Sequence, residues 1–128
     1  MVPERIRQRD QQWLGGHLMK LVDLEPRWMR HSSDEWFEND DGTLTIATAQ
    51  GIAFLCPRCF KKNGGPVGTE TILIWFRDRG VPADETPGPG RWTPNGTDFH
   101  DFSLTPSVNV SNEHWHGFVT SGEIVGGI

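Results

Sequence analysis

The sequence predicts an α+β fold, a mainly antiparallel β-sheet with a zinc knuckle and one or two helices at the N-terminus. Short apolar runs rich in β-branched and aromatic residues recur between turn residues, as they do in antiparallel sheets. Fifteen Gly and nine Pro indicate many turns and leave little room for long helices. Both cysteines of the chain lie in one Cys-x-x-Cys pattern, at residues 56–59, which is typical of a zinc knuckle.

The length and composition indicate a single domain. A chain of 128 residues has the commonest domain size and is long enough to bury a core. Six Trp and seven Phe predict that much of this core is aromatic. We expect residues 1–40 to form a helical N-terminal segment and residues 41–128 to form a zinc-binding β core.

Charge and hydropathy argue against several classes of protein. The net charge of −5 disfavours non-specific nucleic-acid binding, which needs a basic field. No apolar run is long enough for a membrane helix, and the N-terminus lacks the apolar core of a signal peptide. We therefore expect a cytoplasmic protein. In that reducing compartment, two cysteines are more often a metal or redox pair than a structural disulfide.

The N-terminal segment carries a helical pattern. Pro3 suits the first turn of a helix, where its missing N–H is not needed. Gly15 and Gly16 interrupt the apolar stripe, so we expect one broken helix or two short ones that end before Pro26. We expect this apolar stripe to pack against the rest of its own domain rather than to bind a partner. The stripe consists of Ile6, Trp13, Leu14, His17, Leu18, Leu21 and Val22.

Short apolar runs predict the strands. An acidic, solvated loop is expected to close at Asp41-Gly42, a turn that opens the first strand. The run at 71–76 is the clearest buried strand, because it is almost continuously apolar and rich in β-formers. Ser121-Gly122 predicts the last turn. The expected strands are 43–48, 51–55, 71–76, 102–105, 115–119 and 123–125.

Two segments rich in Gly and Pro predict loops. Residues 61–66 follow the cysteine pair, and we expect a turn there that excludes a helix. Residues 80–98 predict a long loop, and a loop of this length in a compact domain is usually functional or mobile. We expect Trp92 and Phe99 to fix parts of this loop to the domain.

The cysteine pair and two late histidines have the ligand count of one tetrahedral zinc site. Zinc prefers four thiolate or imidazole ligands, and a Cys-x-x-Cys turn brings two thiolates to one point. If residues 114–116 lie on a strand, alternation directs both imidazoles to one face and Trp115 to the other. We predict a Zn²⁺ site with Cys56, Cys59, His114 and His116 as ligands.

Other interpretations of these residues stay open. The cysteines are alternatively a free or redox-active dithiol, and the histidines ordinary surface residues. A thioredoxin-type pair begins a helix, which the Gly and Pro at 63–66 disfavour. The fourth ligand is His114, Glu113, His100 or water, and the metal is zinc or iron.

Several motifs resemble a family of small phage and prophage proteins of unknown function, which are often labelled "ammonia monooxygenase" in genomes. The resemblance covers roughly residues 41–125 and the motifs occur in the same order. They are FLCPRCF at 54–60, NGGPVG at 63–68, IWF at 74–76, PGPGRW at 87–92, SLTPS at 103–107 and HWHGFV at 114–119, with Gly122.

The resemblance implies one zinc site built from the Cys-x-x-Cys pair and the late cluster of Cys and His. This chain has His114 or Glu113 where the relatives have a third cysteine close to the final His116. The resemblance also implies a phage or prophage setting, and so the cytoplasm of a bacterial host. It implies no established activity.

Our first functional hypothesis is a mainly structural zinc in a binding or host-modulating module with a protein partner from host or phage. Four protein ligands leave no position for a substrate, so we assign no catalytic residue. The alternative is a zinc-dependent hydrolase or deaminase-like enzyme with an open metal position and Glu113 or Asp101 as proton shuttle. The H-x-E and H-E-x-x-H elements of such enzymes are absent.

A third hypothesis is a contact surface that combines cations with aromatic side chains. Trp75 and Phe76 are better explained as core than as a platform for bases, and a cage of tryptophans around a small ligand is a further alternative. The candidate partner surface consists of Trp92, Arg91, Arg58, Lys61 and Lys62.

Overall fold

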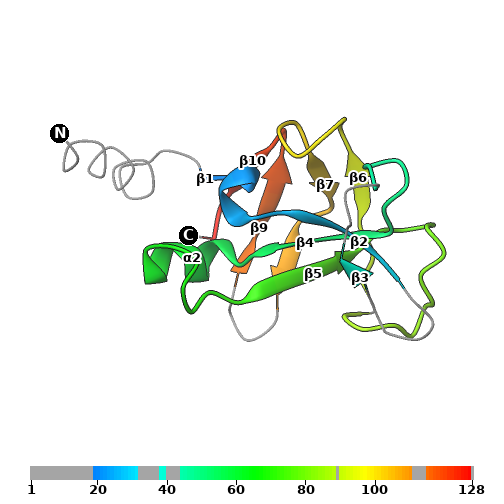
Figure 1. Cartoon of the computed structure of the whole chain (residues 1–128), viewed down its shortest axis with the longest axis horizontal. Coiled ribbons are helices and arrows are strands. Elements are labelled where there is room, and N and C mark those ends of the chain that lie inside the picture. The colour runs from blue at the N-terminus through cyan, green and yellow to red at the C-terminus, as the bar shows by residue number, and fades with distance from the viewer. Residues whose placement is uncertain (1–18, 32–37, 40–43, 89, 111–114, 128) are drawn as a thin grey trace.

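Antiparallel strands make up most of the structure, and one short α-helix accompanies them (Figure 1). The computed structural model describes residues 19–31, 38–39, 44–88, 90–110 and 115–127. The mainly antiparallel β class predicted from the sequence is therefore confirmed. The N-terminal helices were predicted largely within residues 1–18, which lie outside the described residues.

The strands form two four-stranded sheets and one two-stranded ribbon. The first sheet has the order β1-β10-β9-β8, the second β3-β2-β4-β5, and the ribbon pairs β6 with β7. The elements are β1 (Met19–Lys20), a 3-10 helix η1 (Leu21–Leu24), β2 (Arg27–Arg30), β3 (Glu38–Asn39), β4 (Gly51–Leu55), α2 (Pro57–Asn63), β5 (Thr71–Trp75), β6 (Thr93–Asn95), β7 (Ser103–Thr105), β8 (Val108–Val110), β9 (Trp115–Thr120) and β10 (Glu123–Val125).

The main core takes side chains from both sheets. Strand β4 is buried along its whole length, because Ile52 and Phe54 enter the main core while Ala53 faces a smaller cluster with Trp75. Strand β9 instead alternates buried and exposed residues, so only one of its faces meets the core. A β-strand places successive side chains on opposite faces, and these two patterns show which strand is covered on both sides.

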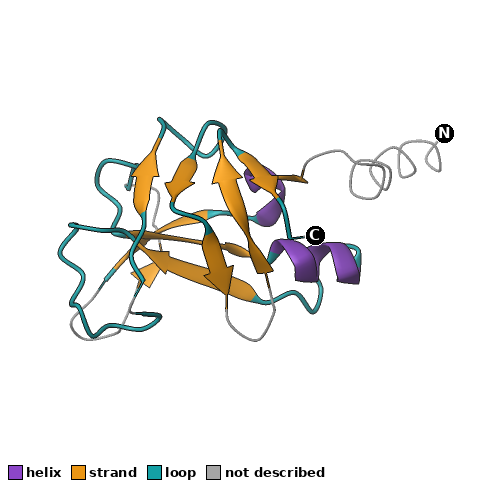
Figure 2. Cartoon of the chain, turned by 180° about the vertical axis from the view of Figure 1, so that it is seen from behind, coloured by secondary structure: helices purple, strands orange, loops and turns teal. Residues whose placement is uncertain are grey.

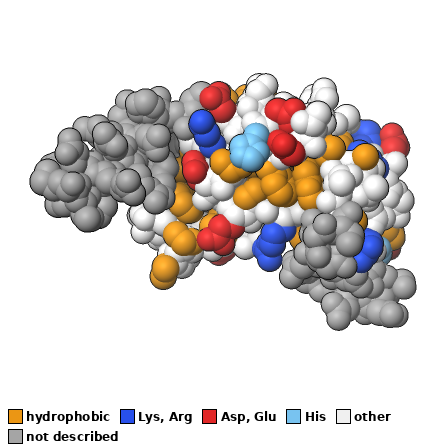
Figure 3. All heavy atoms as spheres, turned by 45° about the horizontal axis from the view of Figure 1, so that its top comes forward, with side chains coloured by type: hydrophobic (Ala, Val, Ile, Leu, Met, Phe, Trp, Pro, Cys, Tyr) orange, Lys and Arg blue, Asp and Glu red, His pale blue; other side chains and the backbone are white. Residues whose placement is uncertain are grey.

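Part of the core reaches the surface. On the face shown in Figure 3, hydrophobic side chains gather across the middle of the molecule and charged side chains border them. The partly buried hydrophobic residues that pack against the main core are Leu44, Ile46, Cys59, Trp92, Phe99 and Val110.

The strand predicted at 43–48 is wrong for its described residues, which form a turn before β4. The carbonyl of Thr45 accepts hydrogen bonds from the N–H groups of Thr48 and Ala49, and the Thr48 hydroxyl accepts one from the Thr45 N–H. Threonine hydroxyls offer the backbone local partners of this kind, and these compete with pairing in a sheet.

The helical stripe does not extend through Met19 and Lys20, which pair with β10 as a strand. Only η1 follows in helical form, and it ends before Pro26 as expected. The pairing of Met19 with Ile124 places Met19 in the main core, a long-range contact that local periodicity does not reveal.

The long loop is fixed by the two aromatic residues expected to hold it. The indole N–H of Trp92 donates to the carbonyl of Ser107 at 3.0 Å, and its backbone bridges to Phe76. The ring of Phe99 stacks on Trp28 at 4.2 Å between centroids. Residues 93–95 of this segment form β6, so the segment is partly regular structure.

A histidine–carboxylate contact closes the loop against β2. His31 Nε2 lies 2.6 Å from Glu85 Oε2, and the His31 ring meets Trp75 edge-on at 5.8 Å. Next to it, the Trp75 indole N–H donates to the carbonyl of Thr86. The His31 hydrogen bond, followed by the Thr86 N–H, holds the pKa of Glu85 below its ordinary value of 4.5.

We expect Trp115→Ala to lower the free energy of unfolding by about 3–5 kcal/mol, because it empties a fully buried indole site. Thr120→Ala, at an exposed position on the same strand, is the matched control and should cost less than about 1 kcal/mol. Urea unfolding of both variants measures the difference, and equal costs would contradict the assigned role of Trp115.

We expect Glu85→Gln to remove part of the acid sensitivity of the protein. A carboxyl group with a lowered folded pKa stabilises the fold above its unfolded pKa, and this stability is lost as the pH falls through the folded pKa. The difference in unfolding free energy between native protein and variant should therefore be largest above about pH 5 and shrink below about pH 4. Urea titrations across this range, with Asp84→Asn as control, measure it; identical pH dependence of both variants would refute it.

Candidate metal centre

The two cysteines lie at the junction of β4 and α2. Cys56 follows the last residue of β4 and is the N-cap of α2, with Pro57 in the first helical turn. Its Sγ accepts a hydrogen bond from the Cys59 N–H at 3.3 Å, and its own N–H donates to the carbonyl of Glu70. The turn therefore gathers both thiols at one point, as the Cys-x-x-Cys pattern predicted.

The prediction that residues 61–66 exclude a helix is wrong. Helix α2 runs from Pro57 to Asn63 and ends at Gly64, which has φ 71° and whose N–H meets the carbonyls of Phe60 and Lys61. A left-handed glycine of this kind ends a helix without preventing it. The cysteine pair thus begins a helix, and the argument against a thioredoxin-type pair from the following glycines does not hold.

The burial of the two thiols differs in a way that bears on their chemistry. Cys56 is 0% exposed, whereas Cys59 is partly exposed. Burial, with a further contribution from the Cys59 thiol, raises the pKa of Cys56 to about 11, although the N–H groups of Cys59 and Arg58 oppose this. A nucleophilic thiol must be ionised and accessible, and Cys56 is neither at neutral pH. A metal ion would instead replace its proton.

His116 lies on the opposite face of β9 from the core. Trp115 is 1% exposed and shares the main core with Cys56, whereas His116 is exposed. The predicted alternation of these two side chains is thus confirmed, but it turns His116 away from the core that holds Cys56. His114 lies outside the described residues.

The start of β9 nevertheless lies close to the cysteine pair. Helix α2 packs against β9, as Figures 1 and 2 show from opposite sides. The ring of Phe54, two residues before Cys56, meets Trp115 edge-on at 6.3 Å between centroids. Within the described ranges, no three His, Cys, Asp or Glu side chains are grouped closely enough to hold a metal ion. The structure thus unites the two cysteines and leaves His116 apart from them.

His100, the alternative ligand, lies toward the other end of β9. A Cβ on Gly122, which follows β9, would clash with the His100 carbonyl. Strand β9 is six residues long, and a strand rises about 3.3 Å per residue. The His100 side chain is 79% exposed and lies beside Asp98. This position separates His100 from the cysteine pair by about the length of β9.

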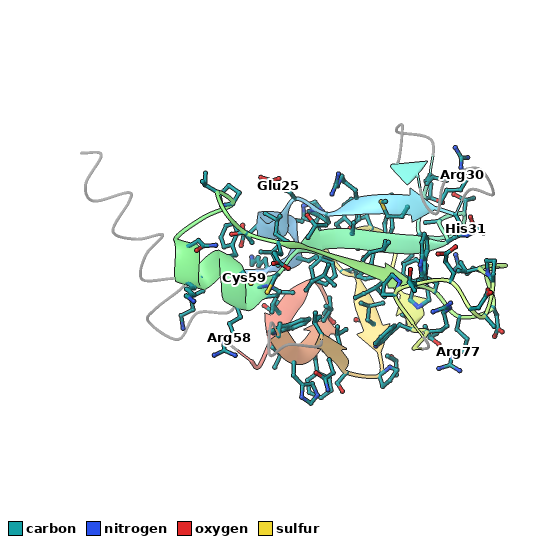
Figure 4. All side chains as sticks on the ribbon, turned by 90° about the horizontal axis from the view of Figure 1, so that it is seen from below. Glu25, Arg30, His31, Arg58, Cys59 and Arg77 are labelled. Atoms are coloured by element: carbon teal, nitrogen blue, oxygen red, sulfur yellow. The ribbon has the colours of Figure 1, made fainter. Side chains whose placement is uncertain are left out.

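The candidate partner surface separates into two parts. Arg58 and Lys62 are exposed on α2, and Figure 4 shows Arg58 extending away from that helix. Arg91 and Trp92 belong to the long loop, at the other end of the molecule from α2 (Figures 1 and 2). The Arg91 guanidinium donates to four loop carbonyls, those of Pro82, Glu85, Pro87 and Gly90. Its role in the fold is to shape the loop.

Trp75 and Trp115 are core residues. Trp75 is 0% exposed and lies in the smaller cluster, whereas Trp115 lies in the main one. Phe76 is also buried. These side chains offer no platform for bases and form no common cage, in agreement with the interpretation favoured from the sequence.

The first sheet carries an exposed apolar pair that was not predicted from the sequence. Phe118 and Val125 face each other across β9 and β10 and are both exposed. The pattern contained this information, because a strand that buries Trp115 must present Phe118 on the outer face together with His116.

Comparison with known proteins found no family model that matches the chain, no similar curated protein and no similar solved structure. The resemblance to phage and prophage proteins rests on the motifs quoted above. Among the described residues, no helix has the length and apolar character needed to cross a membrane.

We expect Cys59 to react with iodoacetamide at neutral pH about tenfold faster than Cys56 in metal-free protein, because Cys56 is buried and its pKa is raised. Peptide mass spectrometry over a time course measures both rates. The urea-unfolded chain is the control, in which the two rates should converge. Faster modification of Cys56 in the folded protein would contradict the burial described here.

Proposed function

We propose that the protein is a small zinc-binding module in which the metal is mainly structural. Cys56 and Cys59 supply two thiolates, and His114 and His116 complete the site. The observation that carries this proposal is the turn at the end of β4, where Cys56 Sγ accepts the Cys59 N–H and the Cys59 side chain lies within reach of Cys56. Backbone N–H groups directed at a sulfur stabilise its ionised, metal-binding form.

The side-chain chemistry of these four residues suits zinc. The positions of the two cysteines suit a shared metal ion, whereas that of His116 does not. Two thiolates neutralise Zn²⁺, and two imidazoles complete its preferred tetrahedron. His116 faces away from the cysteines, so binding through all four residues requires the first residues of β9 to turn out of the sheet. His114 directly precedes Trp115, the first residue of β9. Zinc would then tie β9 to the turn after β4.

The proposed biological role is non-covalent contact with a host or phage protein in the bacterial cytoplasm. The resemblance to phage and prophage proteins supports this setting. The exposed Arg58 and Lys62 of α2 lie beside the proposed metal turn, and they suit an acidic protein surface. A metal-stabilised turn would hold these cations in a fixed position.

We expect natively purified protein to contain about one zinc per chain, measured by inductively coupled plasma mass spectrometry. Cys56→Ser should lose the metal, because the remaining thiolate cannot neutralise the ion, and His116→Ala should weaken its retention against a chelator. Metal removal should lower stability by an amount on the order of 10 kcal/mol, as in small zinc domains.

His100→Ala is the matched control, since it removes an exposed imidazole away from the cysteines and should keep the metal. Metal-free native protein whose stability is unaffected by zinc would refute the proposal. Loss of metal from His100→Ala with retention in His116→Ala would reassign the ligands.

A further inference from the structure

The outer face of the first sheet carries an isolated apolar pair. Phe118 is 50% exposed and Val125 is 36% exposed, and the two are direct cross-strand partners in β9 and β10. Neighbouring partners on an antiparallel pair share a face, so these side chains lie next to each other. We call Phe118 and Val125 the outer apolar pair.

The surroundings of the outer apolar pair are polar. On one side, Glu123 faces Thr120, and Lys20 of β1 faces Glu123. On the other side, the exposed His116 faces Asn109 of β8. A large aromatic side chain that is half exposed in such a frame suggests a contact that the described residues do not supply.

Strand β1 begins beside this pair. Strand β1 runs antiparallel to β10, with Met19 opposite Ile124 and Lys20 opposite Glu123. Val125 follows Ile124 in β10, so the N-terminal end of β1 is the end next to Val125. Residues 1–18 therefore precede Met19, whose partner Ile124 is the neighbour of Val125 in β10.

The composition of residues 1–18 suits this position. Their apolar side chains, Ile6, Trp13, Leu14 and Leu18, recur at the spacing of one helix face. As a helix, the fourteen residues before Gly15 would be about 21 Å long, more than the width of a four-stranded sheet with strands about 4.8 Å apart. The segment has three Arg against one Glu and one Asp, whereas the whole chain has a net charge of −5. Charge thus favours its contact with the rest of the chain.

We propose that residues 1–18 dock across the outer face of the first sheet and cover Phe118 and Val125. Covalent attachment favours this occupant over a second copy, because a short tether gives an effective concentration in the millimolar range. Docking buries the outer apolar pair and the apolar face of the segment together. This inference is independent of the metal site.

The test places a photo-crosslinker on the pair. In the full chain, Phe118→p-benzoylphenylalanine should, on irradiation of dilute protein, form crosslinks to residues 1–18 of the same chain, identified by mass spectrometry. Val67→p-benzoylphenylalanine is the matched control, because Val67 is 87% exposed on the turn after α2 and should not give these products. Covalent dimers through position 118, or the same products from position 67, would overturn the proposal.

A second measurement needs no crosslinker. In Phe118→Ser, trypsin should cleave after Arg5, Arg7 and Arg9 about tenfold faster than in native protein, because cleavage follows the undocked population. Val67→Ser should leave these rates unchanged. Equal cleavage of the native protein and Phe118→Ser would refute docking. Far-ultraviolet circular dichroism of both variants confirms that the fold is intact.

Discussion

The burial of Trp115 between the two sheets is the contact on which much of the structure depends. Its indole packs edge-on against Phe54 of β4, so it joins the first sheet to the centre of the second. The indole N–H donates to the carbonyl of Gly126 at 2.9 Å, which draws the C-terminal residues over the ring. A Cβ on Gly117 would clash with this ring, and glycine is therefore required beside it. Because β9 must bury Trp115, the directions of all its other side chains follow.

The same constraint places the two cysteine thiols near the start of β9. Strand β4 delivers Cys56 into the core next to Phe54, and α2 begins there and packs against β9. Cys56 is therefore buried at the start of the helix, whereas Cys59 is partly exposed on it, and burial keeps Cys56 protonated at neutral pH. A buried and protonated thiol is a poor nucleophile, because the thiolate is the reactive form. The face turned away from Trp115 carries His116 and the outer apolar pair.

Two arginines, Arg79 and Arg91, organise the opposite end of the molecule. Arg79 donates to the carbonyls of Ile46 and Ala49, and Arg91 holds the long loop in the same way. Hydrogen bonds from a charged guanidinium to backbone carbonyls satisfy groups that lack partners in a sheet. This explains how a segment rich in Pro and Gly keeps a defined path, and why Arg91 does not form one surface with the cations of α2.

The sequence by itself determined the β class, the aromatic core and the strands whose pattern is local, such as β4, β5 and β9. Continuous apolar runs and the alternation around Trp115 are properties of neighbouring residues, so they can be recognised without knowing the tertiary structure. Only the tertiary structure decided that Met19 pairs with β10, that Thr45 closes a turn, and that the chain after Cys56 coils into a helix capped by Gly64. It also decided that His116 and Cys56 belong to opposite sides of β9. The pairing of Met19 and the direction of His116 depend on which distant strands pair and which face each one buries, and no local pattern contains that choice.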